Sequence, residues 1–133
     1  MNQTRVVLGL DIGTARIGVA IADERMRIPV PKGVVEVNGQ EMEAIMSLIK
    51  EHDISTVVVG YPRNQSGEAT QQTQLVESVV EPLRKFVDIQ FQDESLTSVL
   101  AENRLKSRNK PYSRGDIDAE AAVIILEDYL ETQ

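Results

Sequence analysis

The chain has 133 residues, a formal net charge of −7 and no cysteine. This length fits one domain with its own hydrophobic core, and the absence of cysteine excludes disulfides and cysteine-ligated zinc. The N-terminal segment lacks the apolar core of a signal peptide, and no run approaches the roughly 20 apolar residues of a membrane helix. We therefore expect a single domain over residues 1–133 that is cytoplasmic and has no membrane partner.

Two apolar runs open the chain. Residues 6–12 and 17–23 predict two strands of a hairpin, joined by the short turn 13–16. Residues 25–32 contain two prolines and predict a loop or a sheet edge, and residues 33–37 predict a third strand. The first three strands therefore form a meander.

Helices and strands alternate in the rest of the chain. The pattern predicts helices over 40–52, 70–86, 96–105 and 116–130, with Pro82 shortening or kinking the second. It predicts strands over 55–60 and 87–93, and loops over 61–70 and from the end of the third helix to Gly115. A meander followed by strand–helix alternation favours the α/β class, with about five strands in one mixed sheet and helices on its faces.

Three acidic residues occupy positions that the pattern does not predict to be simple solvent-exposed surface. Asp11 interrupts an apolar strand, where an ionised carboxylate needs partners, although it could also cap the turn at Gly13. Glu94 follows a strand at the end where open α/β sheets bind ligands, while its neighbour Asp93 fits a helix N-cap. Asp118 shares a helix face with Ala122 and Ile125, so it points toward the sheet, and Asp116 is the better cap.

Converging carboxylates repel one another unless a cation lies between them. Oxygen ligands without histidine or cysteine suit Mg²⁺ or Mn²⁺, and such a site can hydrolyse a phosphodiester. The single histidine, His52, lies at a predicted helix end between two acids and is interpreted as a surface residue. Schemes that depend on a Ser-His-Asp or Cys-His arrangement are therefore excluded.

Basic residues are concentrated in one segment of this acidic chain. Five of them, with no acidic residue between, lie from Asn103 to Gly115: Arg104, Lys106, Arg108, Lys110 and Arg114. Affinity for a phosphate backbone comes mostly from lysine and arginine, so this segment is a candidate nucleic-acid contact. An ordinary solvated loop is the alternative. Aromatic residues are few, which argues against extensive base stacking, with Tyr112 as one candidate.

Four motifs together resemble a known family. LGLDIGTARIGVA, VVVGYPRNQSGE, DESLT and DIDAEAAVIIL, in that order, are similar to the YqgF/RuvX family of RNase H-like bacterial proteins, described as pre-16S rRNA nucleases and, earlier, as Holliday junction resolvases. The resemblance implies an RNase H-like fold with a five-stranded mixed sheet. The chain departs from the family pattern at Ser95, where the family usually has arginine. It departs more mildly at Tyr61 and Arg63, where the family commonly has apolar residues.

The resemblance assigns roles to individual residues. It implies that Asp11, Glu94 and Asp118 bind Mg²⁺ or Mn²⁺ and catalyse hydrolysis that leaves a 3′-hydroxyl and a 5′-phosphate. Arg16 is expected to contact phosphate, and Asn64, in the loop over the site, to contact substrate. We expect further backbone contacts from the basic segment: Arg104, Arg108, Lys110 and Arg114.

The favoured function is a metal-dependent endonuclease that processes the 5′ end of precursor 16S ribosomal RNA, chosen mainly on the resemblance. A resolvase acting on branched DNA would need a homodimer, and the sequence leaves monomer and homodimer open. A non-catalytic nucleic-acid or ribosome-assembly module is the alternative of a different class. The turn DIGT also resembles the phosphate-binding turn of the actin, sugar-kinase and Hsp70 ATPases, which need a second domain that 133 residues do not supply.

Overall fold

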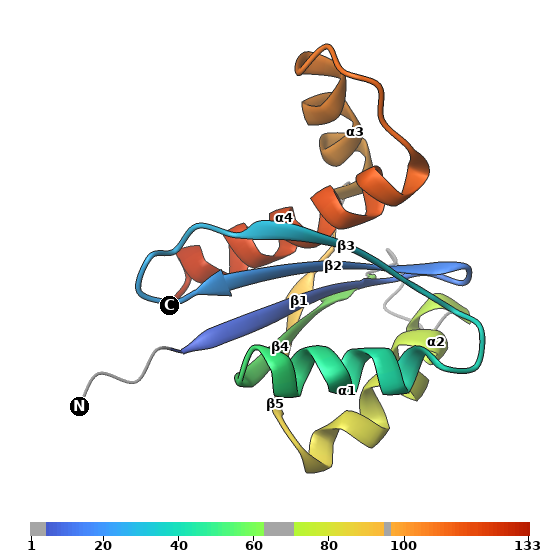
Figure 1. Cartoon of the computed structure of the whole chain (residues 1–133), viewed down its shortest axis with the longest axis vertical. Coiled ribbons are helices and arrows are strands. Elements are labelled where there is room, and N and C mark those ends of the chain that lie inside the picture. The colour runs from blue at the N-terminus through green and yellow to red at the C-terminus, as the bar shows by residue number, and fades with distance from the viewer. Residues whose placement is uncertain (1–4, 63–70, 95–96) are drawn as a thin grey trace.

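The computed structural model describes residues 5–62, 71–94 and 97–133. Its five strands form one mixed sheet in the order β3-β2-β1-β4-β5 (Figure 1). The strands span Val6–Ile12 (β1), Arg16–Asp23 (β2), Val30–Glu36 (β3), Ile54–Tyr61 (β4) and Asp88–Asp93 (β5). β2 pairs antiparallel with β1 and β3, whereas β4 pairs parallel with β1 and β5. The predicted meander followed by parallel strands is confirmed.

Helices cover both faces of the sheet. They span Glu41–Glu51 (α1), Gln71–Val80 (α2), Thr97–Ser107 (α3) and Arg114–Glu131 (α4), and a 3₁₀ helix, η1, spans Glu81–Lys85. α2 ends where Pro82 removes a backbone donor, and the chain continues as η1, as the predicted shortening requires. None of the helices in the described ranges is long and apolar enough to cross a membrane.

Alternation along β1 sends its side chains to two separate cores. Leu8, Leu10 and Ile12 pack on one face with the residues of α1 and α2, while Val7 packs on the other face with α4. α4 crosses that second face, and α3 stands out beyond it (Figure 1). Asp11 follows the alternation of Val7 and therefore faces α4. An acid in β1 thus points toward the only helix in the described ranges that packs on that face of the sheet.

The third strand begins earlier than predicted. The sequence predicts a loop or an edge for residues 30–32, whereas β3 takes them in from Val30 and ends at Glu36. Pro31 is tolerated because β3 is an edge strand. Gly33 has a φ of 95°, which only glycine adopts without strain.

The predicted basic loop is shorter than expected and comprises residues 108–113, which corrects the sequence interpretation. α3 carries Arg104 as predicted but continues to Ser107, so it also carries Lys106, and α4 already begins at Arg114. The N-cap of α4 is Ser113 and not Asp116. The Ser113 hydroxyl accepts a hydrogen bond from the backbone N–H of Asp116, and the Asp116 carboxylate accepts one from the backbone N–H of Ser113. Asp93 is the last residue of β5, and because residues 95 and 96 before α3 lie outside the described residues, its capping role stays a prediction.

Candidate active site

Asp11 lies near the end of β1 at the centre of the sheet. Its register partner in β2 is Gly18, and its side chain is partly buried. Burial, a hydrogen bond with Glu94 and the charges of Glu94 and Asp118 raise the pKa of Asp11 from 3.8 to about 9. The structure therefore holds this carboxyl among other carboxyls rather than beside a basic partner.

Glu94 follows β5 directly. Its backbone N–H donates to the Tyr61 carbonyl at 3.1 Å and so continues the pairing of β5 with β4. Its Oε1 accepts a hydrogen bond from the hydroxyl of Thr97, the first residue of α3, at 3.2 Å. A Cβ on Gly60 would lie 3.0 Å from Glu94 Oε2 and 2.5 Å from Cδ1 of Ile125. Glycine at the end of β4 thus leaves the space that the Glu94 carboxylate uses.

Asp118 reaches the site because α4 packs unusually close to β2. A Cβ on Gly18 would lie 1.9 Å from the Asp118 carbonyl oxygen, so only glycine permits this approach. Since Gly18 is the register partner of Asp11, the same close contact brings the two acids together. Asp118 Oδ2 accepts a hydrogen bond from Arg16 Nε at 2.7 Å, and both side chains are partly exposed. Arg16 thus occupies one oxygen of Asp118.

The three predicted acids line one depression of about 380 Å³. The other lining residues come from the ends of β1 and β4, the first turn, α2 and α3: Ile12, Gly13, Pro62, Gln72, Thr97, Ser98 and Val99. Gln72 Nε2 donates to the Ile12 carbonyl at 2.6 Å, which fixes α2 against the end of β1. The structure therefore brings Asp11, Glu94 and Asp118 together from β1, the end of β5 and α4. We call this depression the carboxylate pocket.

A second depression of about 310 Å³ adjoins the carboxylate pocket and shares Asp118, Ser98 and Val99 with it. Arg16 and Arg114, two of the predicted phosphate contacts, line it. Glu102 also lines it and accepts a hydrogen bond from the Tyr112 hydroxyl at 3.0 Å. The predicted stacking residue Tyr112 therefore braces the connection between α3 and α4.

The donor chemistry of the carboxylate pocket fits a hard divalent cation. Three carboxylates supply oxygen ligands without nitrogen or sulfur, as Mg²⁺ and Mn²⁺ prefer. Burial, followed by the contact and charge of Glu94 and the charge of Asp118, raises the pKa of Asp11, as expected of a carboxyl with no cation beside it. Across residues 5–62, 71–94 and 97–133, no group of three acids or histidines is gathered tightly enough to hold a metal as it stands. Asp118 is drawn toward Arg16, and Asp11 bonds Glu94, so metal binding requires small side-chain movements.

Comparison with known proteins identifies the family. A family model described as "RuvX: Holliday junction resolvase" matches residues 5–132. The chain belongs to the RuvX family. Relatives named "Putative pre-16S rRNA nuclease" include one from Chloroflexus aurantiacus, 37% identical over 100% of this chain and 90% of the relative. Another, from Salinibacter ruber, is 34% identical over 97% of this chain and 94% of the relative.

Solved structures confirm the fold. RuvC of Thermus thermophilus in complex with a Holliday junction substrate superposes with a TM-score of 0.62 over 96% of each chain, at 17% identity. RuvC of the same organism in another structure gives a TM-score of 0.57 at 13% identity. The expected RNase H-like architecture of this RuvX-family chain is confirmed by that likeness.

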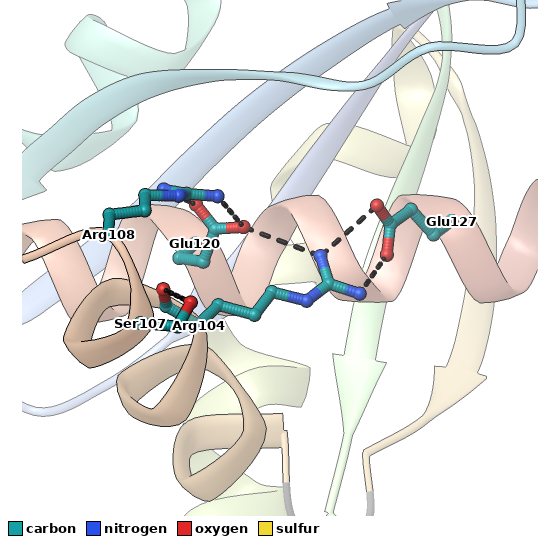
Figure 2. A network of polar contacts seen from close by, with 5 residues as sticks. All are labelled: Arg104, Ser107, Arg108, Glu120 and Glu127. Atoms are coloured by element: carbon teal, nitrogen blue, oxygen red, sulfur yellow. Dashed lines mark hydrogen bonds and ion pairs between the residues drawn. The ribbon is translucent and has the colours of Figure 1, made fainter.

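Two predicted nucleic-acid contacts, Arg104 and Arg108, lie in a network of ion pairs (Figure 2). Arg108 donates to both oxygens of Glu120, at 3.1 and 3.3 Å. Arg104 donates to both oxygens of Glu127, at 2.7 and 3.1 Å, and to Glu120 at 3.4 Å. Glu120 is only 4% exposed, whereas the two arginines are about half exposed. We call these four residues the α3–α4 clamp.

The sequence interpretation missed Glu120, although a signal was present. Glu120 stands inside an apolar run of α4 in which both neighbours are buried alanines. The reasoning that singled out Asp11, an acid within a buried element, applies equally here. The clamp holds α3 on α4 together with the small apolar cluster of Ala101, Ala121 and Ile124. Because α3 begins at Thr97, it also carries a wall of the carboxylate pocket.

The remaining predicted residues lie apart. Lys110 is exposed in the connection between α3 and α4, and Asn64 lies outside the described residues. His52 follows α1 and lines a larger depression, about 770 Å³, at the opposite end of the sheet, with Arg5, Asp53 and Asp88. None of the three candidate carboxylates lines that depression, so we place the chemistry in the smaller carboxylate pocket.

Proposed function

We propose that this chain is a divalent-metal-dependent endonuclease that hydrolyses phosphodiester bonds, with precursor 16S ribosomal RNA, at its 5′ end, as the favoured substrate. The observation that carries the proposal is the meeting of Asp11, Glu94 and Asp118 in one pocket where their charges repel. Close carboxylates with a raised pKa are typical of functional sites rather than of structural ones. The names of the relatives support the substrate.

The residues of the pocket divide into two roles. Asp11 and Glu94 would hold the metal from the central strands, and Asp118 would hold it from α4 through the oxygen that Arg16 leaves available. A bound Mg²⁺ or Mn²⁺ supplies activation of water and stabilisation of the charge that develops on the leaving oxygen. Thr97 keeps the Glu94 carboxylate oriented through its hydroxyl.

Arg16 would orient the scissile phosphate. Its side chain is 30% exposed, and the guanidinium contacts Asp118 through Nε, which leaves the terminal nitrogens for phosphate oxygens. Arg114 lines the adjoining depression, and Lys110 is exposed beyond it, so both are proposed to bind the backbone farther along. Arg104 and Arg108 could add to this contact, but carboxylates already offset their charge. Asn64 stays a prediction.

The test is cleavage of a labelled precursor rRNA fragment and, in parallel, of a four-way DNA junction. Each is incubated with Mg²⁺, Mn²⁺ or EDTA, for the unmodified chain, for Asp11→Asn and for a control, Asp88→Asn. Asp88 starts β5 at the opposite end of the sheet. We expect metal-dependent cutting of RNA by the unmodified chain and the control, and loss of about 10³-fold or more in Asp11→Asn.

Other outcomes separate the alternatives. Preferred cutting of the junction would favour a resolvase, the activity in the description of the family model, and two symmetric cuts would require a homodimer. Binding of RNA without cutting by the folded chain would favour the non-catalytic module. Cleavage that persists in EDTA would contradict the proposed chemistry.

A further inference from the structure

A third depression, of about 360 Å³, differs in chemistry from the carboxylate pocket. Its lining residues are Tyr61, Glu77, Phe91 and Asp93. The rings of Tyr61 and Phe91 meet edge to face, with centroids 5.0 Å apart. Phe91 is 39% exposed although it is a large apolar residue on the edge strand β5. An exposed aromatic wall with a polar rim is typical of a binding surface.

The backbone ties this aromatic depression to the carboxylate pocket. Tyr61 ends β4, and its carbonyl accepts the backbone N–H of Glu94. Asp93, which lines the aromatic depression, directly precedes Glu94. Tyr61 and Asp93 are also register partners in the two parallel strands. Successive strand residues point to opposite faces of the sheet, so Tyr61 and Asp93 lie on the α1–α2 face and Glu94 on the α4 face. A base in the aromatic depression would therefore lie at the same end of the sheet as the metal-binding acids proposed above, on the other face.

The charges around the depression select the kind of group that fits. Glu77 and Asp93 would repel a phosphate, but a carboxylate accepts hydrogen bonds from the exocyclic amine of a base, as in contacts to N4 of cytosine. Glu77 is held in place by the Tyr61 hydroxyl at 3.5 Å and by Arg84 at 3.9 Å. The Arg84 guanidinium lies 5.8 Å from the centroid of the Phe91 ring. Aromatic rings accompanied by arginine are the usual platform for bases of single strands.

We propose that the aromatic depression binds one unpaired nucleobase with an exocyclic amine, stacked on Phe91 next to Tyr61 and donating its amine hydrogen bond to Glu77 or Asp93. The inference rests on the proposed function for its substrate class, a nucleic acid. Bases inside a duplex are already stacked and paired, and extruding one costs a few kcal/mol. The depression therefore favours a substrate with a single-stranded stretch that reaches this end of the sheet, which distinguishes a precursor RNA end from an intact duplex arm.

The test measures binding separately from cleavage. Short fluorescent oligoribonucleotides of cytidine, adenosine or uridine, and a matched oligomer with abasic sites, are titrated onto the full chain carrying Asp11→Asn, so that cutting does not interfere. The variants added to it are Phe91→Leu, Glu77→Met and a matched control, Phe86→Leu. Phe86 is the only other phenylalanine of the chain, is 64% exposed and does not line the depression. A 5-iodocytidine oligomer, photocrosslinked to the chain without these added changes, locates the contact by mass spectrometry.

We expect Phe91→Leu to weaken cytidine binding about tenfold and Phe86→Leu to leave it unchanged. Glu77→Met should bring the affinities for cytidine and uridine toward equality, and the crosslink should fall on Tyr61 or Phe91. Equal binding of the abasic oligomer, or equal effects of the two phenylalanine variants, would overturn the inference. If RNA is cut but Phe91→Leu binds oligomers normally, the base-binding inference is contradicted and the proposed nuclease activity is supported. If oligomers bind through Phe91 but no RNA is cut, the base-binding inference is supported and the proposed nuclease activity is contradicted.

Discussion

Two buried or partly buried acids, Glu120 in α4 and Asp11 in β1 facing α4, differ in how their negative charge is compensated. Glu120 is buried against α3 and contacts two arginines. Asp11 faces the other side of the same helix, and its neighbours are two further acids, which together with burial raise its pKa to about 9. Arginine is present near this second site as well, but Arg16 contacts Asp118 and not Asp11 in the hydrogen bonds of the described residues.

The difference separates structure from function. A buried charge with complete partners orients two helices and needs nothing further. Carboxylates that are held together without a cation destabilise the fold, and such an arrangement is expected where a ligand supplies the missing charge. The two sites are also connected, because the clamp fixes α3 and the first residue of α3, Thr97, bonds Glu94. The following predictions test this comparison.

The largest effect is expected from removing the cations of the clamp. The double variant Arg104→Met/Arg108→Met leaves the Glu120 carboxylate buried without a partner, which costs about 3–5 kcal/mol of unfolding free energy. Glu120→Gln should cost only about 1 kcal/mol, because both arginines are half exposed and water can solvate them. Urea unfolding followed by circular dichroism measures both.

A rescue variant sharpens this test. Adding Glu120→Met to the two arginine changes removes the unpaired charge, so most of the lost stability should return. If the double variant is no less stable than Glu120→Gln, the clamp is not what compensates Glu120.

Gly18→Ala is expected to affect the carboxylate pocket itself. The new Cβ would meet the Asp118 carbonyl at 1.9 Å, so α4 must shift away from β2. Such overpacking costs about 1–3 kcal/mol and moves Asp118 away from Asp11, so the metal affinity should fall as well. Urea unfolding and Mn²⁺ titration calorimetry measure the two effects.

Gly115→Ala is the matched control for this change. Gly115 lies in α4, the helix that Gly18 of β2 approaches, but a Cβ on Gly115 would lie 3.5 Å from its nearest neighbour, a methyl carbon of Val34. Alanine is the better helix former, so this variant should be as stable as the unmodified chain or slightly more so. Equal destabilisation by the two changes would mean that the close approach at Gly18 does not matter.

The sequence predicted the frame of the molecule and the three acids, because both depend on local patterns. Continuous apolar runs identified β1, β2 and β4, and the acid set into one of them identified Asp11. The α3–α4 clamp was missed because its residues are 12 to 23 positions apart and pair only once the two helices fold together. A cluster of basic residues in the sequence cannot show whether acids elsewhere in the chain already neutralise it.

The aromatic depression was missed for a related reason. Low aromatic content predicted little stacking, yet Tyr61 and Phe91 are 30 positions apart and become neighbours through the pairing of β4 with β5. Composition counts residues, and only the register of the sheet shows that two of them share a site.

The pH dependence of stability should report the uncompensated charge at Asp11. Between about pH 4 and pH 9, native Asp11 retains a proton that the unfolded chain has released, because its pKa rises from 3.8 to about 9 on folding. The unfolding free energy of the metal-free chain should therefore fall as pH rises through this window. Asp11→Asn removes the contribution, so in EDTA the variant should become more stable than the unmodified chain, with a gap that widens from pH 5 to pH 8.

Thermal unfolding at the two pH values, with EDTA or Mg²⁺, measures this gap. Mg²⁺ should stabilise the unmodified chain and leave Asp11→Asn nearly unchanged, since a ligand stabilises only the state that binds it. A gap of the same size at pH 5 and pH 8 would contradict the raised pKa.

The smallest effect distinguishes cations that are paired from those that are exposed. Lys110 is exposed in the connection between α3 and α4, whereas Arg108 is bound to both oxygens of Glu120. Each phosphate contact that is lost lowers the salt dependence of single-strand binding by about 0.7 in the slope of log K against log salt. Lys110→Gln should show a change of this size, and Arg108→Gln a smaller one, because the Arg108 charge is already offset. Titrations of RNA at several salt concentrations give both slopes, and a larger change for Arg108→Gln would mean that Arg108 leaves the clamp to bind the backbone.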